Sequence, residues 1–147
     1  MAHFLAVEYN KVRPKHCAPV HFLPVRVVEE KDDTNEALGE RRFCVEPPLP
    51  SNDFVKFSSN TGFWDEDYLD ESLLRFTMFT HTQTHGYLMI ADLQGCKVEN
   101  EYYLTDPVVL CEDVRRFGRT NLGEKFMEKV VASTKGHMHE RGWKLAP

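Results

Sequence analysis

The sequence predicts an α+β fold in a single domain. Three observations predict this class. A pair of Val- and Phe-rich segments near the N-terminus is typical of strands, and a second pair of short apolar segments follows in the middle of the chain. Longer segments before, between and after these pairs carry apolar side chains at helical spacing. We therefore expect a fragment of a small sheet, followed by a helix-rich part with a short central hairpin.

The first third of the chain is expected to contain one helix and one pair of strands. Residues 2–11 have apolar side chains on one side of a helix that closes near Pro14. Residues 20–29 and 42–46 are predicted to pair as strands around a solvated acidic turn at residues 29–36. The Pro-rich run after the second strand ends it.

The rest of the chain is expected to be mainly helical. Residues 65–84 begin with an acidic turn that suits a helix dipole, and residues 121–135 form a last helix. Between them, residues 87–91 and 102–104 are predicted to pair as strands around a polar turn.

Composition excludes several classes of function. The formal charge of −5 argues against a nucleic-acid binder, and no apolar run approaches the ~20 residues of a membrane span. The N-terminus lacks the pattern of a signal peptide. The four cysteines lie among largely apolar neighbours without CxxC spacing, which favours buried reduced thiols and a cytoplasmic location: Cys17, Cys44, Cys96 and Cys111.

The residues that point to chemistry lie between positions 86 and 123. A hydrophobic run stops at Asp92-Leu93-Gln94-Gly95, where the Asp92 and Gln94 side chains point to one face of an extended segment. Their oxygen atoms are ligands that Mg²⁺ prefers. A second acid, Asp106, precedes Pro107 and can orient a hydroxyl beside such a metal. Phosphoryl transfer needs these parts, although solvated acids at strand ends are the alternative.

In this order, these residues resemble the α-kinases, atypical serine/threonine protein kinases of the myosin heavy chain kinase and elongation factor 2 kinase type. The likeness continues upstream in six short segments: Glu8-Tyr9-Asn10, Phe22-Leu23-Pro24-Val25, Val45-Glu46-Pro47, Val55-Lys56-Phe57, Asn60-Thr61-Gly62-Phe63 and Phe79-Thr80-His81. The resemblance implies the C-terminal lobe of an α-kinase fold plus the last strands of the N-terminal lobe. Residues 1–50 would form the end of the N-terminal lobe and the hinge, and residues 51–147 the C-terminal lobe.

The resemblance also assigns expected roles. Asp92 and Gln94 would hold Mg²⁺ against the phosphates of ATP, and Asp106 would serve the substrate hydroxyl. Glu46 would mark the hinge beside adenine, while Lys56 and Asn60 would approach the phosphates. The loop on the substrate side would use four residues: Gly118, Thr120, Asn121 and Gly123. Thr120 or Asn121 could also cap the last helix, and the two roles of the loop are compatible.

The sequence departs from the family at its zinc site. His81 keeps the first ligand position, but the expected downstream ligand positions carry Thr134, Gly136 and Glu140. His137 and His139 are the possible substitutes. We therefore do not expect a structural zinc ion.

A second departure concerns the phosphate-anchoring lysine, which the family carries on strands earlier than any in this chain. The expected function is an ATP-dependent serine/threonine kinase acting on a protein substrate, with a partner or an upstream segment completing the N-terminal lobe. The alternative is a catalytically inactive, kinase-like interaction module, and a zinc-stabilised adaptor is a third possibility. Neither nucleic acid nor membrane is an expected partner.

Overall fold

The computed structural model describes residues 1–30 and 41–144. The described part contains three α-helices, one 3-10 helix and eight strands. In chain order they are α1 (Ala2–Val12), β1 (Val20–Phe22), β2 (Arg26–Glu30), β3 (Arg41–Val45), β4 (Val55–Lys56), η1 (Glu66–Tyr68), α2 (Glu71–Gln83), β5 (Leu88–Ala91), β6 (Gln94–Val98), β7 (Glu101–Thr105), β8 (Val108–Cys111) and α3 (Glu124–Glu140).

The strands form one four-stranded sheet and two strand pairs. The sheet has the order β1-β7-β6-β4, with β1 parallel to β7 and the other neighbours antiparallel. β5 pairs with β8, and β2 pairs with β3. The predicted α+β class is confirmed, because the helices and the largely antiparallel strands form separate parts of the fold.

One predicted pairing is wrong. Residues 102–104 lie in β7, which pairs with β6 and β1 rather than with β5. The polar segment between residues 91 and 102, which is predicted to form a turn, contains β6. Glu99 and Asn100 close the β6–β7 hairpin with positive φ at both residues, the two-residue turn geometry that matches strand twist.

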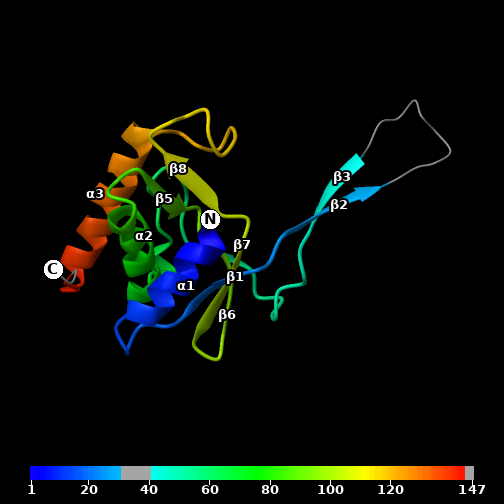
Figure 1. The fold of residues 1–147 in the computed structure, drawn as a ribbon. Helices are drawn as coiled ribbons and strands as arrows, with labels where there is room; N and C mark the ends of the chain where they lie inside the picture. The colour runs from blue at the N-terminus through cyan, green and yellow to red at the C-terminus, as the bar shows by residue number, and fades with distance from the viewer. Residues whose placement is uncertain (31–40, 145–147) are drawn as a thin grey trace.

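The helices gather beside the strands and share one core with them (Figure 1). α2 packs against α1, α3 and β5, and α3 also packs on β8. Leu5, Phe76, Ile90 and Leu104 belong to a single buried cluster that joins α1, α2, β5 and β7. A second cluster lies between the β5–β8 pair and α3.

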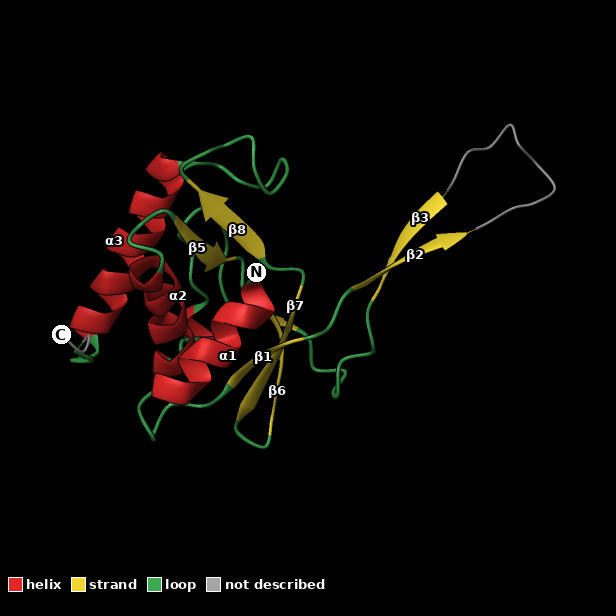
Figure 2. Cartoon of the chain, viewed as in Figure 1, coloured by secondary structure: helices red, strands yellow, loops and turns green. Residues whose placement is uncertain are grey.

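The β2–β3 hairpin projects away from this body (Figure 2). Val27 is 65% exposed and Val45 is 49% exposed, so apolar side chains of the hairpin face solvent. In contrast, α1 and β1 contribute to the core that residues 51–144 also build. Within the described part of residues 1–50, the β2–β3 hairpin projects from the body, whereas α1 and β1 share the core of the body.

Several element boundaries differ from expectation for local reasons. The strand expected at residues 20–29 is interrupted between Phe22 and Arg26, where Pro24 stops a regular strand. The helix expected at residues 65–84 is divided into η1 and α2. The acidic turn expected at residues 29–36 lies almost entirely outside the described residues.

The cysteines are free thiols, of which Cys17, Cys96 and Cys111 are buried. Cys44 is exposed on β3, which corrects the expectation that all four are buried. Over the residues that the structure describes, no helix is both long enough and apolar enough to traverse a bilayer.

Candidate active site

Two short non-strand interruptions lie where the β5–β8 pair ends and the β6–β7 pair begins. Asp92 lies in one of these interruptions and Asp106 in the other. The chain passes from β5 to β6 through Asp92, and it returns from β7 to β8 through Asp106. Residues in register flank both interruptions: Ala91 with Val108, and Gln94 with Thr105. The strand pairing therefore brings the two acids to the same region of the fold, although β5 and β7 are not partners.

Both acids have a left-handed backbone conformation, with φ of 58° at Asp92 and 44° at Asp106. Asp tolerates this region better than most residues, because its short polar side chain can hydrogen-bond locally. This conformation interrupts the extended backbone. Neither acid therefore continues the alternating side-chain pattern of the strand that precedes it. Asp106 is exposed, whereas the Asp92 side chain is 14% exposed.

Gln94 connects the two interruptions. Its Nε2 atom donates a hydrogen bond to the Asp106 carbonyl oxygen over 3.2 Å. The next residue, Gly95, has φ of 151°, and a Cβ atom there would lie 2.0 Å from the Tyr103 carbonyl oxygen. Glycine is therefore required at position 95 for β6 to approach β7, and this approach sets the position of Gln94.

Lys56 supplies a positive charge beside the acids. It is the register partner of Gln94 on β4, and its Nζ atom lies 2.7 Å from Asp92 Oδ1. The Lys56 side chain is 51% exposed, so its ammonium group remains accessible to solvent. The candidate site thus contains a carboxylate that already has a cationic neighbour.

Lys56, Gln94 and Thr105 form a row of register partners across β4, β6 and β7. Glu46, in the segment that follows β3, approaches the Thr105 end of this row. Its carboxylate accepts a hydrogen bond from the Thr105 hydroxyl. Thr105 is the register partner of Gln94, which in turn is the register partner of Lys56. The structure therefore places the expected hinge residue Glu46 at one end of a row of register partners that continues through Thr105 and Gln94 to Lys56.

The segment after β4 is hydrogen-bonded to the turn that carries Asp92. The Phe57 and Ser58 amides donate to the Leu93 carbonyl oxygen, and the Leu93 amide donates to Ser58 Oγ over 3.1 Å. Further along, Asn60 Nδ2 donates to the Thr120 carbonyl oxygen over 2.9 Å. Asn60 and the loop around Thr120 are therefore held together.

Within that loop, Asn121 has a structural role. It is 6% exposed, and its Oδ1 atom accepts from the Cys111 and Gly123 amides while Nδ2 donates to the Asp113 and Arg116 carbonyls. Its side chain is fully engaged by backbone groups of its own loop and of the end of β8. Gly123 is the N-cap of α3, so the expected capping of this helix by Thr120 or Asn121 is wrong. Gly118 lies in open space.

The alpha-kinase family model matches residues 1–137 of this chain. The chain belongs to the alpha-kinase family. It is 31% identical over 130 residues to myosin heavy chain kinase B of Dictyostelium discoideum, covering 88% of this chain and 16% of that protein. Identity to eukaryotic elongation factor 2 kinase of Rattus norvegicus is 28% over 120 residues, which cover 82% of this chain and 15% of that kinase.

Solved alpha-kinase structures share the fold. The apoenzyme alpha-kinase domain of myosin-II heavy chain kinase A matches with a TM-score of 0.75 and 26% identity, over 90% of this chain and 48% of that chain. The complex of the same kinase with AMPPCP matches with a TM-score of 0.73 and 26% identity, over 89% and 48% of the two chains. This alpha-kinase chain therefore spans about half the length of these solved chains.

The histidines considered as zinc ligands do not gather in this alpha-kinase chain. Among the described residues, the group of three or more potential ligands that lie together is His16, Cys17 and Glu71, not His81, His137 and His139. His137 Nδ1 instead lies 3.2 Å from Glu66 Oε1. Burial, followed by the nearby Lys135 ammonium, lowers the pKa of His81.

Sequence reasoning missed two residues of the site. Ser58 holds the Leu93 amide, and Thr105 holds Glu46. Thr105 directly precedes Asp106 in the sequence, but only the structure shows that β7 alternates in burial and that the Thr105 side chain reaches Glu46. Nothing in the sequence around Ser58 distinguishes its hydroxyl from other polar loop residues.

Proposed function

We propose that this chain is a serine/threonine protein kinase domain of the alpha-kinase type, which transfers the γ-phosphate of Mg-ATP to a hydroxyl of a protein substrate. One observation carries the proposal: Asp92, Gln94 and Asp106 all lie where the β5–β8 pair ends and the β6–β7 pair begins, and Gln94 is hydrogen-bonded to Asp106. Family membership supplies the reaction type. Catalysis of phosphoryl transfer depends mainly on positioning and charge stabilisation, which such a cluster supports.

The residues present fit a magnesium ion. The Asp92 carboxylate and the Gln94 amide oxygen are hard oxygen ligands. Gln94 Nε2 donates to the Asp106 carbonyl oxygen, so the amide oxygen of Gln94 takes no part in that hydrogen bond. The Lys56 ammonium lies 2.7 Å from Asp92, so a positive charge already stabilises this carboxylate. Bound Mg²⁺ supplies neutralisation of the phosphate charge that develops in the reaction.

Asp106 is assigned the role of orienting the substrate hydroxyl and accepting its proton. Its backbone is fixed by the Gln94 hydrogen bond and by the following proline, while the residue itself is exposed. Such a positioned base typically contributes a factor of about 10²–10⁴ to the rate. The proton on the attacking hydroxyl moves to the Asp106 carboxylate as the hydroxyl oxygen bonds to the γ-phosphorus, while the bond from that phosphorus to the bridging oxygen breaks and ADP leaves.

Lys56 and Asn60 are assigned to the phosphate side of the nucleotide, and Glu46 to the adenine side. Lys56 is accessible and lies next to Asp92, and Glu46 is held by Thr105 at the far end of the same residue row. The AMPPCP complex of myosin heavy chain kinase A supports nucleotide binding by this fold. Gly118, Thr120 and Gly123 remain assigned to the substrate side through their loop backbone.

We further propose that residues 1–50 include the end of the N-terminal lobe, carried by the β2–β3 hairpin. Its exposed valines support strand addition by another segment or by a partner protein, since exposed apolar strand edges are prone to pairing. The free cysteines support a reducing, cytoplasmic location. The same exposed hairpin favours the second candidate, a non-catalytic interaction module that binds a partner through it.

A phosphotransfer assay separates the two candidates. The chain is incubated with Mg²⁺, radiolabelled ATP and a serine- and threonine-rich protein, and phosphoamino acids are analysed. The kinase proposal expects phosphoserine or phosphothreonine that is lost in Asp106→Asn and retained in Asp67→Asn, an exposed acid on η1. A well-folded chain that neither binds Mg-nucleotide nor transfers phosphate supports the interaction module.

A further inference from the structure

We propose that His16, Cys17 and Glu71 form a binding site for a transition-metal ion of the Zn²⁺ class. One ligand atom from each residue lies within 4.8 Å of the other two. His16 and Cys17 lie in the loop between α1 and β1, and Glu71 is the first residue of α2. The cluster lies at the opposite end of α2 from His81, so it is separate from the zinc position considered above.

The spacing of the ligand atoms suits a tetrahedral ion. His16 Nε2 lies 3.4 Å from Glu71 Oε2. Nitrogen and oxygen ligands with bonds of about 2.0–2.1 Å to tetrahedral zinc are separated by about 3.4 Å, so this pair already has the required separation. A thiolate bond of about 2.3 Å places sulfur about 3.6 Å from the other ligands. The Cys17 side chain therefore has to approach by roughly 1 Å at most.

The donor set selects the class of ion. A thiolate, an imidazole and a carboxylate together match Zn²⁺, whereas Mg²⁺ and Ca²⁺ prefer oxygen ligands alone. Three protein ligands leave a fourth coordination position. The His16 side chain is 65% exposed, so that position is accessible to water or to a further ligand from solvent.

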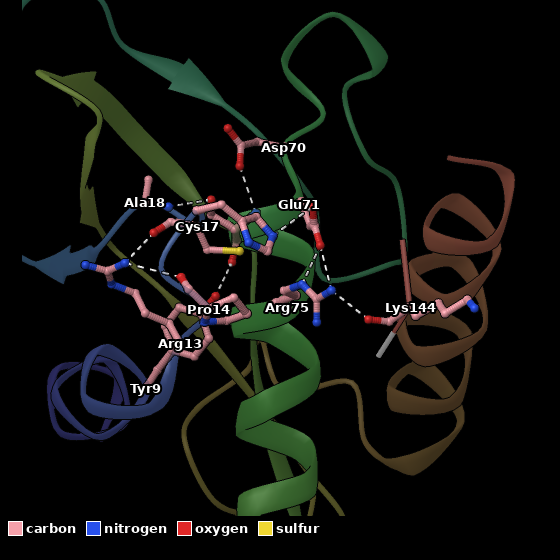
Figure 3. Close-up of polar contacts among 11 residues, drawn as sticks. Tyr9, Arg13, Pro14, Cys17, Ala18, Asp70, Glu71, Arg75 and Lys144 are labelled. Carbon is pink, nitrogen blue, oxygen red and sulfur yellow. Dashed lines mark hydrogen bonds and ion pairs between the residues drawn. The ribbon is translucent and has the colours of Figure 1, made fainter. Parts of the chain in front are cut away.

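The two segments that carry the ligands are already fastened together (Figure 3). The Ala18 amide donates to Ser72 Oγ over 2.8 Å, and the Tyr9 hydroxyl donates to the Ser72 carbonyl oxygen over 3.1 Å. Cys17 itself is fixed by a hydrogen bond from its amide to the Pro14 carbonyl oxygen. Little ordering is therefore needed when an ion binds, because both ligand-bearing segments are in place.

Arg75 orients the carboxylate without covering the ligand atom. Its guanidinium lies 2.6 Å from Glu71 Oε1 and also donates to the Lys144 carbonyl oxygen (Figure 3). Oε2 is the Glu71 oxygen that faces His16. Hydrogen bonds that hold a metal-binding carboxylate in this way are typical of metal sites.

Cobalt(II) substitution tests the proposal, because a thiolate bound to Co²⁺ gives a charge-transfer band in the near ultraviolet. The reduced full chain is titrated with Co²⁺ and then with Zn²⁺. We expect this band to saturate at one Co²⁺ per chain and to disappear when Zn²⁺ displaces the cobalt. Absence of the band in the folded chain overturns the proposal.

Variants assign the ligands. Cys17→Ser is expected to abolish the band, and His16→Ala to weaken Co²⁺ affinity at least about tenfold, whereas Cys44→Ser is the matched control that retains both. Because His16 is exposed, His16→Ala keeps the fold even if Cys17→Ser does not, as circular dichroism will show. Unchanged affinity in His16→Ala, or loss of binding in His81→Ala alone, contradicts the proposed site.

Discussion

At the scale of single residues, Gly95 determines whether the strands of the candidate site can meet. A Cβ atom at this position would lie 2.0 Å from the Tyr103 carbonyl oxygen and 2.9 Å from Leu104 Cα, which are backbone atoms that cannot rotate away. We expect Gly95→Ala to lower the free energy of unfolding by about 3 kcal/mol or more. Urea denaturation measures this change.

Gly118→Ala is the matched control for that measurement. Gly118 also has a positive φ, of 81°, but no atom lies within 4 Å of the added Cβ. Its substitution is expected to cost only about 1 kcal/mol, because it introduces backbone strain without a clash. Equal losses in the two variants would mean that the close approach of β6 and β7 does not determine stability at position 95.

Lys56 is the residue whose charge balances Asp92. We expect Lys56→Met to weaken Mg-nucleotide binding about tenfold or more, since a hydrogen bond to a charged group contributes about 1.5–3 kcal/mol. Isothermal calorimetry measures the affinity, with Lys129→Met on the exposed face of α3 as the control. Tighter binding in Lys56→Met would indicate instead that Lys56 only competes with the metal for Asp92.

At the scale of elements, the start of α2 depends on Asp70. Its Oδ1 atom accepts from the Ser72 amide as the N-cap, and Lys97 Nζ lies 2.8 Å from Oδ2. Burial alone would raise the pKa of Asp70, but hydrogen bonds from Lys97, Ser72 and Tyr102 outweigh it and lower the pKa to about 2. The ionised carboxylate therefore joins α2 to the β6–β7 hairpin.

This interaction predicts a specific loss of stability in acid. Because the folded pKa lies below the unfolded value of 3.8, the stabilisation is complete above about pH 4 and is lost as the pH falls toward 2. Asp70→Asn keeps a good N-cap but removes the charge, so we expect a loss of about 2 kcal/mol at pH 7 and a flatter stability profile below pH 4. An unchanged profile would contradict the charge interaction.

The sequence predicts the helices of this chain better than its strands. α1, α2 and α3 are long enough for apolar spacing and turn residues to identify them. β4 and β8 have two and four residues, and their pairing depends on distant partners that no local pattern specifies. The strand pair predicted to bring Asp92 and Asp106 together is wrong, because β6 lies in a polar segment that has no strand pattern.

At the scale of the whole molecule, the candidate site lies in the body while the β2–β3 hairpin projects from it. In the part of the chain that the structure describes, the hairpin projects from the body and so provides little cover for a nucleotide bound at the acids. We expect this chain alone to bind Mg-ATP weakly, because a bound phosphate would keep much of its contact with water. Low-micromolar affinity by calorimetry would contradict this expectation and would assign the missing charge stabilisation to Lys56.

The central claim is that Asp92, Gln94 and Asp106 surround one metal–nucleotide site. Mn²⁺ replaces Mg²⁺ in such sites and broadens the NMR signals of nearby amides. Titration of the labelled chain with Mn²⁺ and AMPPCP should broaden the amides of residues 92, 94 and 106 first, and Asp92→Asn should remove the effect. Selective broadening elsewhere, with these three amides unaffected at saturating Mn²⁺–AMPPCP, would contradict the account.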